Sequence, residues 1–254
     1  MCECEQKKGL FEMLTKTQAF VLGLIGAFLV MCTIGFFILL CLMLNGNSLS
    51  NNSAVKEDSS APKKFSECVD SGKYASQVQA DSQLGSSLGV QGTPATFING
   101  YLVSGAMPYD VTKDVIDDLL AGRKPFIDNY KTYQMETGDL QKAEMPELEG
   151  AVWRGSPDAK VSLVEFSDFE CPYCARFSTT IEQLINEYKD KIRFTYRHFP
   201  LSFHASAQKA AEAFECAKDQ NKTWELYAKM FELSNASQLN LANIKKAAGE
   251  IGLK

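Results

Sequence analysis

Two cysteines, Cys171 and Cys174, lie three positions apart in the stretch SDFECPYCARF. An apolar, strand-like run (VSLVEF, 161–166) precedes them, and a helical pattern follows from about 174 to 189. At a helix start, unpaired backbone N–H groups and the helix dipole favour negative charge, which pushes the first sulfur toward the thiolate. A thiolate attacks disulfides and also binds metals. The stretch therefore predicts either a redox pair or half of a metal site.

The amino-acid composition limits the classes of protein to which this chain can belong. The 254 residues are 45% hydrophobic and 22% charged, which is typical of globular protein with an additional apolar segment. A formal net charge of −5, with no run of Lys and Arg, argues against nucleic acid as a partner. Eight cysteines over this length are too sparse for a small disulfide scaffold, so each group needs its own interpretation.

The N-terminal part predicts a membrane anchor. Residues 19–44 are 26 residues without a charge, more than the ~20 needed to cross a bilayer. A helix that packs on the core of a small globular domain keeps a polar face, which this run lacks, and a cleaved signal peptide has a shorter apolar region. Residues 1–18 are interpreted as a cytoplasmic tail, because lysines precede the span. Residues 45–63 are Asn- and Ser-rich and are interpreted as a flexible tether. We therefore expect a single-pass protein of the cell membrane, contacting the bilayer through 19–44, with residues 64–254 extracytoplasmic.

The globular part, 64–254, divides into three sections. The first, 64–121, has helical patterns, then two short strands, 95–98 and 101–105, around an Asn-Gly turn, then a helix from 109 that is stopped by Gly122. The second, 122–150, has weak periodicity and is interpreted as a connector. The third, 151–254, predicts a short strand and turn at 151–160, strands 161–166 and 192–201, the helix after the cysteines, and about three helices from 204 to 252.

A zinc site at Cys171 and Cys174 would need two more ligands. His198 and His204 are not spaced as a compact pair, and no second CxxC is present. A redox pair is therefore favoured over a metal site, and both histidines are interpreted as packing or capping residues.

Glu165 is a candidate proton donor or acceptor. By the period-two rule for strands it shares a face with Val161 and Leu163, which favours a buried carboxyl. A buried carboxyl has a raised pKa and can exchange a proton with a neighbouring thiol. The alternative is an exposed charge on a strand edge. Asp168, nearer the turn, is interpreted as a cap-type residue.

Several segments resemble one family. The segments FSDFECPYCARF, RHFPL and HASAQKAAEAFECA, with KFSECVDSGKYASQVQADSQLGSSLGVQGTPATFINGYLVSGA, resemble the DsbA-like branch of the thioredoxin-fold oxidoreductases. The resemblance implies that Cys171 is the exposed attacking sulfur and Cys174 the buried resolving one. It also implies that Thr93-Pro94 forms a cis peptide bond beside them, a conformation that proline makes accessible. Without the resemblance, Gly92-Thr93-Pro94 would be interpreted as a plain turn.

The resemblance extends to other residues and to partners. It places an acid at Glu165. Some relatives carry a second disulfide in the helical region, so Cys68 and Cys216 form either that disulfide or two buried free thiols. It implies no cofactor. The expected partners are the thiols of substrate proteins and a membrane or soluble redox protein that resets the CPYC pair.

The order of the segments is unusual. In the family the CxxC half precedes the cis-proline half, whereas here 64–121 precedes 151–254. We therefore predict an α/β, thioredoxin-like fold with a helical insertion, circularly permuted and preceded by one transmembrane helix. Two alternatives are a domain-swapped dimer and a rearranged sequence.

The expected activity is thiol-disulfide exchange, with catalytic residues Cys171, Cys174, Pro94, Thr93 and Glu165. We expect disulfide formation in extracytoplasmic proteins. The same residues could run the reaction backward, as a reductase or isomerase. Two other functions stay open: a metal or iron–sulfur carrier, and a binding module without turnover.

Overall fold

The computed structural model describes residues 63–125, 140, 142–145 and 148–254. The predicted tail, membrane span and tether, and most of the connector, lie outside these residues. Within the described ranges, no helix is both long enough and apolar enough to cross a membrane.

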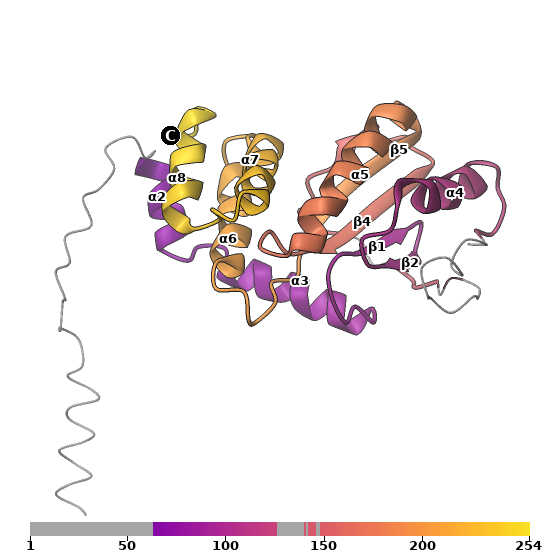
Figure 1. The fold of residues 1–254 in the computed structure, drawn as a ribbon, viewed down its shortest axis with the longest axis horizontal. Coiled ribbons are helices and arrows are strands. Elements are labelled where there is room, and N and C mark those ends of the chain that lie inside the picture. The colour runs from indigo at the N-terminus through magenta and orange to yellow at the C-terminus, as the bar shows by residue number, and fades with distance from the viewer. Residues whose placement is uncertain (1–62, 126–139, 141, 146–147) are drawn as a thin grey trace, which may run out of the picture. The chain divides into compact units, whose positions relative to one another are not determined.

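The centre of the domain is a 5-stranded sheet with the order β2-β1-β4-β5-β3. The strands are β1 (Ala95–Ile98), β2 (Tyr101–Ser104), β3 (Arg154–Gly155), β4 (Val161–Ser167) and β5 (Ile192–His198). β4 and β5 are parallel, whereas β1 pairs antiparallel with both β2 and β4. Strands from both sides of the connector therefore share one sheet, as Figure 1 shows.

Helices cover both faces of the sheet and gather at one end of it (Figure 1). Helices α4 and α5 pack on one face and α3 on the other, while α2, α6, α7 and α8 lie together near the C-terminus. The helices are α2 (Lys63–Asp70), α3 (Ala75–Ser87), α4 (Tyr109–Leu120), α5 (Pro172–Tyr188), α6 (Ala207–Lys218), α7 (Thr223–Asn235) and α8 (Leu241–Glu250), with a 3-10 turn, η3 (Lys189–Lys191), before β5.

Alternation along the strands produces two hydrophobic cores. In β4, Leu163 points into the larger core with α4, α5 and α7, whereas Val164 and Phe166 point into a smaller core under α3. Gly85 on α3 allows this close packing, because a Cβ there would lie 2.8 Å from the Phe166 ring.

The hairpin of β1 and β2 turns at Asn99 and Gly100, which have φ values of 47° and 87°. Asn-Gly is the pair that tolerates two positive φ angles in a two-residue hairpin loop. The predicted strands, the helix from 109, the helix after the cysteines and three C-terminal helices are all confirmed, with boundaries that differ by a few residues.

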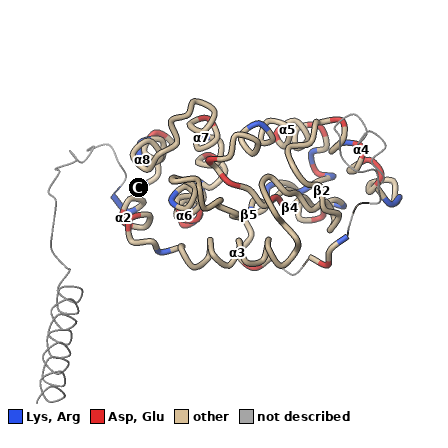
Figure 2. Tube along the Cα trace, turned by 60° about the horizontal axis from the view of Figure 1, so that its bottom comes forward, with Lys and Arg blue, Asp and Glu red and all other residues tan. Residues whose placement is uncertain are grey.

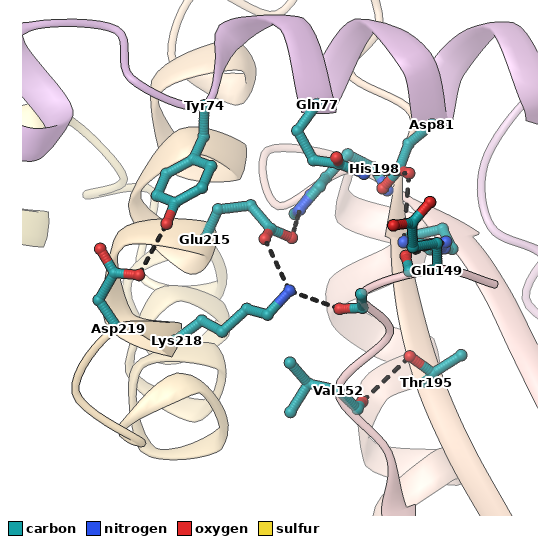
Figure 3. A network of polar contacts seen from close by, with 12 residues as sticks. Tyr74, Gln77, Asp81, Glu149, Val152, Thr195, His198, Glu215, Lys218 and Asp219 are labelled. Carbon is teal, nitrogen blue, oxygen red and sulfur yellow. Dashed lines mark hydrogen bonds and ion pairs between the residues drawn. The ribbon is translucent and has the colours of Figure 1, made fainter.

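The first section of the domain is joined to the last helices by covalent and polar contacts. Cys68 on α2 and Cys216 on α6 form a disulfide across 148 positions. The N–H of Phe65 donates to the carbonyl of Lys254 at 2.8 Å. Asp219 accepts hydrogen bonds from Tyr74 and from the Lys73 ammonium group, of which Figure 3 shows the first.

A buried polar network ties α3 to β5 and α6 (Figure 3). The Asp81 carboxylate on α3 accepts the N–H of His198 at 3.1 Å and pairs with Arg197 at 3.3 Å. The His198 ring bonds Glu215 on α6 at 3.0 Å. Because a buried charge is costly without its partner, loss of one member of this network should destabilise the packing of α3.

Replacing Asp81 with alanine should destabilise the domain. It leaves the buried Arg197 guanidinium without its ion pair and the His198 N–H without an acceptor, so we expect a loss of about 3–5 kcal/mol in the free energy of unfolding. Urea unfolding measures it.

Asp219→Ala is the matched control, because it also removes a carboxylate that links the two sections, but at the surface. Its loss should be much smaller, since solvent screens exposed pairs. Equal losses in the free energy of unfolding for the two variants would show that the buried network contributes no more to stability than an ion pair at the surface.

Candidate redox site

The CPYC turn lies between the end of β4 and the start of α5. Cys171 is the N-cap of α5, and Pro172 occupies the first turn, where a missing N–H costs nothing. The N–H of Cys171 donates to the carbonyl of Asp168 at 3.1 Å. Phe169 anchors the turn by stacking on Tyr196 with ring centroids 4.6 Å apart. The local backbone hydrogen bond and the packing of Phe169 thus place both thiols at the N-terminus of α5.

The Cys171 sulfur is held in an environment that favours the thiolate. Hydrogen bonds from the Cys174 thiol and from the backbone N–H groups of Cys174 and Tyr173 lower the pKa of Cys171 from its ordinary value to about 5, against the opposing effect of burial. Most of this sulfur is therefore ionised at neutral pH in the reduced protein.

The expectation that Cys171 is exposed is wrong for this structure, since the residue is 3% exposed. The Cys171 sulfur lies 3.6 Å from the carbonyl oxygen of Thr93, so the loop before β1 covers it. Cys174 is more deeply buried, at 0% exposure. The order of accessibility within the pair is the one expected, although both sulfurs are sheltered.

The loop beside Cys171 contains a cis peptide bond between Thr93 and Pro94. Pro94 directly precedes β1, and its carbonyl accepts the N–H of Gly105 at 2.8 Å, which ties the loop to the end of β2. The structure therefore brings together Cys171, Thr93 and Pro94, although the two segments are separated by 78 positions.

Glu165 and Cys174 share the buried side of the site. Glu165 is fully buried, and neither of its carboxyl oxygens has a hydrogen-bond partner among the described residues. Burial, with a smaller effect from the Cys171 charge, raises the pKa of Glu165 to about 8. Burial, the hydrogen bond to Cys171 and the Glu165 charge raise the pKa of Cys174. The pKa values of the two thiols are thus shifted in opposite directions, downward for Cys171 and upward for Cys174.

Polar groups from neighbouring strands flank Glu165. In register, Thr96 of β1 lies on one side of it and Tyr196 of β5 on the other. The hydroxyl groups of Thr96, Tyr196 and Ser167 are buried and have no partner among the described residues. Buried polar groups of this kind are normally satisfied by protein atoms or by water. The row therefore forms a polar strip on an otherwise apolar face, next to Cys174.

The role of Asp168 differs from the cap-type role predicted, because Cys171 is the residue that begins α5. The Asp168 carboxylate instead accepts from the N–H of Glu170 at 2.7 Å, the N–H of Leu201 at 2.8 Å and Nδ1 of His204 at 2.7 Å. Sequence reasoning missed this connection, because residues 201 and 204 reach the turn only through the fold. His198, by contrast, packs as expected.

Of the two alternatives for Cys68 and Cys216, the structure shows the disulfide, and the free cysteines among the described residues are Cys171 and Cys174. The described ranges contain no group of three or more His, Cys, Asp or Glu arranged to hold a metal ion.

Comparison with known families matches both halves of the domain. A DSBA-like thioredoxin domain model matches residues 52–117, and a thioredoxin model matches residues 147–251. The two matches lie on either side of the connector and contain, respectively, the Thr93-Pro94 loop and the CPYC turn. Both models describe thioredoxin-fold domains, and together the two matches support a DsbA-like thioredoxin-fold oxidoreductase.

Similar proteins share only parts of their length with this chain. It is 37% identical over 101 residues to the Na(+)/H(+) antiporter NhaA 3 of Salinispora tropica, covering 39% of this chain and 15% of that protein. It is 42% identical over 79 residues to NhaA 1 of Mycolicibacterium gilvum, covering 31% of this chain and 13% of that protein.

Two solved structures are similar over about half of their chains. A periplasmic thioredoxin-like protein from Salmonella enterica serovar Typhimurium is 23% identical, with a TM-score of 0.35 and coverage of 41% of this chain and 59% of that one. The catalytic domain of Proteus mirabilis ScsC is 28% identical, with a TM-score of 0.34 and coverage of 40% and 56%.

Alkylation of the reduced chain with iodoacetamide should show the low pKa of Cys171. Because the thiolate reacts, and the pKa is lowered to about 5, the rate at Cys171 should fall to half its plateau near pH 5 and stay constant from about pH 6.5 to 8. Cys174 should react far more slowly.

Cys174→Ala removes the hydrogen bond that contributes most to this shift, so its midpoint should move upward. A native midpoint near 8.5, the ordinary cysteine value, would contradict the geometry.

Proposed function

We propose that this chain is a membrane-anchored thiol-disulfide oxidoreductase that forms disulfides in proteins outside the cytoplasm. The observation that carries the proposal is the position of the Cys171 sulfur at the start of α5, beside the buried Cys174 and 3.6 Å from the Thr93 carbonyl oxygen.

The proposed reaction starts from the oxidised Cys171–Cys174 pair. A substrate thiolate attacks the Cys171 sulfur, forming a mixed disulfide and releasing Cys174 as a thiolate, which takes up a proton. A second substrate thiolate then attacks the substrate sulfur of the mixed disulfide and releases Cys171 as a thiolate. The substrate dithiol loses two electrons and two protons in total and becomes a disulfide, and the pair becomes reduced. A membrane or soluble redox partner then reoxidises the pair.

The direction of the reaction follows from the stability of the reduced pair. A thiolate at Cys171 is stabilised by the hydrogen bonds that lower its pKa, and this stabilisation is lost when the disulfide forms. Stabilising the reduced form makes the disulfide a stronger oxidant. Oxidation of substrates is therefore favoured over the reductase direction, although the same two sulfurs serve both.

Glu165 is proposed to supply the proton that Cys174 takes up. Its raised pKa, about 8, keeps the carboxyl protonated at neutral pH, and its charge is coupled to that of Cys174. Proton transfer from a positioned acid to a leaving thiolate is general acid catalysis.

The membrane location is also a proposal. It is supported by the uncharged run 19–44 and by the Cys68–Cys216 disulfide, which fits an oxidising compartment. Alkaline washing of membranes should leave the chain in the pellet, and release of the chain would contradict the membrane anchor.

Nucleic acid is not proposed as a partner, since Figure 2 shows Lys and Arg spread among Asp and Glu over the domain.

We also propose that the domain is circularly permuted relative to the usual family order. Two observations support this. The Thr93-Pro94 loop reaches Cys171 within one chain, and Lys254 lies at the start of α2, hydrogen-bonded to Phe65. A single closed domain buries both sections of the sheet without a second copy.

Glu165→Gln should flatten the pH dependence of stability of the reduced chain. The folded-state pKa of about 8 lies above the ordinary glutamate value of 4.5. The protonated carboxyl therefore favours folding fully below about pH 4.5, and this contribution is lost as the pH rises to about 8. Between these two pH values, the free energy of unfolding of the native chain should therefore fall by on the order of 4 kcal/mol more than that of the variant.

The same variant should slow single-turnover reduction of the disulfide by a substrate dithiol, on the order of 100-fold if Glu165 supplies the proton. Glu232→Gln, an exposed carboxyl on α7, is the control. If Glu165→Gln changes stability but not this rate, the proton role is wrong.

The reduction potential of the Cys171–Cys174 pair tests the direction of the reaction. Equilibration of the chain in glutathione buffers should give a value of about −180 to −120 mV, the range of proteins that oxidise or isomerise disulfides. Cys171→Ser, which cannot form the disulfide, is the control for background thiol signal. A potential near −270 mV, as in thioredoxin, would contradict the proposal that the pair oxidises its substrates.

A further inference from the structure

The loop between β5 and α6 brings a histidine to the redox turn. Nδ1 of His204 lies 2.7 Å from Oδ2 of Asp168. The backbone carbonyl of Asp168 accepts the N–H of Cys171 at 3.1 Å. One residue of the turn therefore holds the imidazole ring with its carboxylate and the reactive cysteine with its backbone.

The Asp168 carboxylate determines which nitrogen of the His204 ring carries the proton. The Asp168 side chain is fully buried, and it also accepts the N–H of Glu170 at 2.7 Å and the N–H of Leu201 at 2.8 Å. A carboxylate can only accept hydrogen bonds, so Nδ1 of His204 is the donor in this pair. In the neutral ring the other nitrogen, Nε2, is then an acceptor.

Nε2 of His204 is available for a proton. It has no hydrogen-bond partner among the described residues, and 16% of the side chain is exposed. The second histidine differs, because His198 is fully buried and its Nε2 is bound to Glu215. The position of His204 is fixed by its backbone N–H, which donates to the carbonyl of Leu201 at 3.0 Å. A base that is oriented by a third group through one nitrogen and open at the other is the usual arrangement for activating a nucleophile.

We propose that His204 is a catalytic base that takes the proton from the substrate thiol as this thiol attacks Cys171, and that Asp168 positions the ring. This inference rests on the proposed function, because it assumes that a substrate thiol reaches Cys171. Nε2 accepts the thiol proton, and the substrate sulfur forms a bond to the Cys171 sulfur. The Cys171–Cys174 bond breaks, and its electron pair leaves on Cys174. The imidazolium then releases its proton to water.

The attack requires such a base, because the thiolate is the nucleophile and a free cysteine is only a few per cent thiolate at pH 7. Glu165 does not serve this purpose, since it is fully buried and its proposed proton goes to Cys174. The charged side chains of the turn that contact the loop are Asp168 and Glu170, and Glu170 is bound to the N–H of Ser206 at 2.6 Å. His204 is therefore the group of this loop that is placed to accept the proton.

The base can raise the rate only where the substrate thiol is protonated. At pH 7 the gain has a ceiling of about 30-fold, set by the fraction of free cysteine that is already ionised. At a pH above the ordinary cysteine pKa of about 8.5 the gain should disappear. This limit separates proton removal from any effect of His204 on the shape of the loop.

The test uses two reduced peptides of one sequence, in which the attacking residue is either cysteine or selenocysteine. A selenol is ionised at neutral pH and needs no base. The 254-residue chain is used in detergent, in its disulfide form, as native protein and as His204→Asn. The asparagine amide replaces Nδ1 and can still donate to Asp168, whereas Nε2 is lost. The measured quantity is the second-order rate constant for reduction of the Cys171–Cys174 pair, as a function of pH.

We expect His204→Asn to react about tenfold more slowly than the native chain with the cysteine peptide at pH 7. The two rate constants should converge above about pH 9, where the substrate is ionised. With the selenocysteine peptide the variant and the native chain should react at the same rate throughout.

An unchanged rate with the cysteine peptide at pH 7 would overturn the inference. Equal losses with both peptides, or a loss that persists at high pH, would also overturn it, because either result would indicate a structural or charge effect of His204. If the native chain is reduced by neither peptide, the proposed function is refuted, and the inference with it.

Discussion

The antiparallel pairing of β1 with β4 is the contact on which the site depends. Ala95 is paired with Phe166 and Ile98 with Leu163, so the start of β1 lies beside the end of β4. The loop that enters β1 contains Thr93 and Pro94, and the turn that leaves β4 contains Cys171. Because the strands run in opposite directions, these two segments meet at the same end of the two strands. A parallel pairing would place them at opposite ends.

The same ladder determines the inner side of the site. Glu165 lies in the middle of it, between Thr96 and Tyr196, with its carboxyl in a face that is otherwise apolar. Burial there raises the pKa of Glu165, while the helix start and its hydrogen bonds lower that of Cys171. One sulfur is therefore favoured as a thiolate and the other as a thiol, which is the asymmetry that disulfide exchange requires. The sheet supplies the buried acid and α5 supplies the thiolate.

Local sequence patterns predicted the strands, the helices and the buried position of Glu165, because each of these follows from periodicity or turn residues within a few positions. The Asn99-Gly100 hairpin is an example. The Asp168 contacts were not predictable, since they join the turn to residues 201 and 204 through the packing of the β5–α6 loop. The sheltering of Cys171 was missed for the same reason: the group that covers it, the Thr93 carbonyl, is 78 positions away. The buried network of Asp81, Arg197, His198 and Glu215 likewise has no local signature.

The most direct measurement is to cut the connector and determine what stays together. A protease site placed within 126–139 would separate the Thr93-Pro94 section from the CPYC section, with the Cys68–Cys216 disulfide also removed by Ser substitutions at both cysteines. We expect the two pieces to remain one particle with the mass of a single chain across a dilution series, and to retain the low pKa of Cys171. A particle with the mass of two chains that resists dilution, or pieces that separate once cut, would contradict a site assembled within one closed domain.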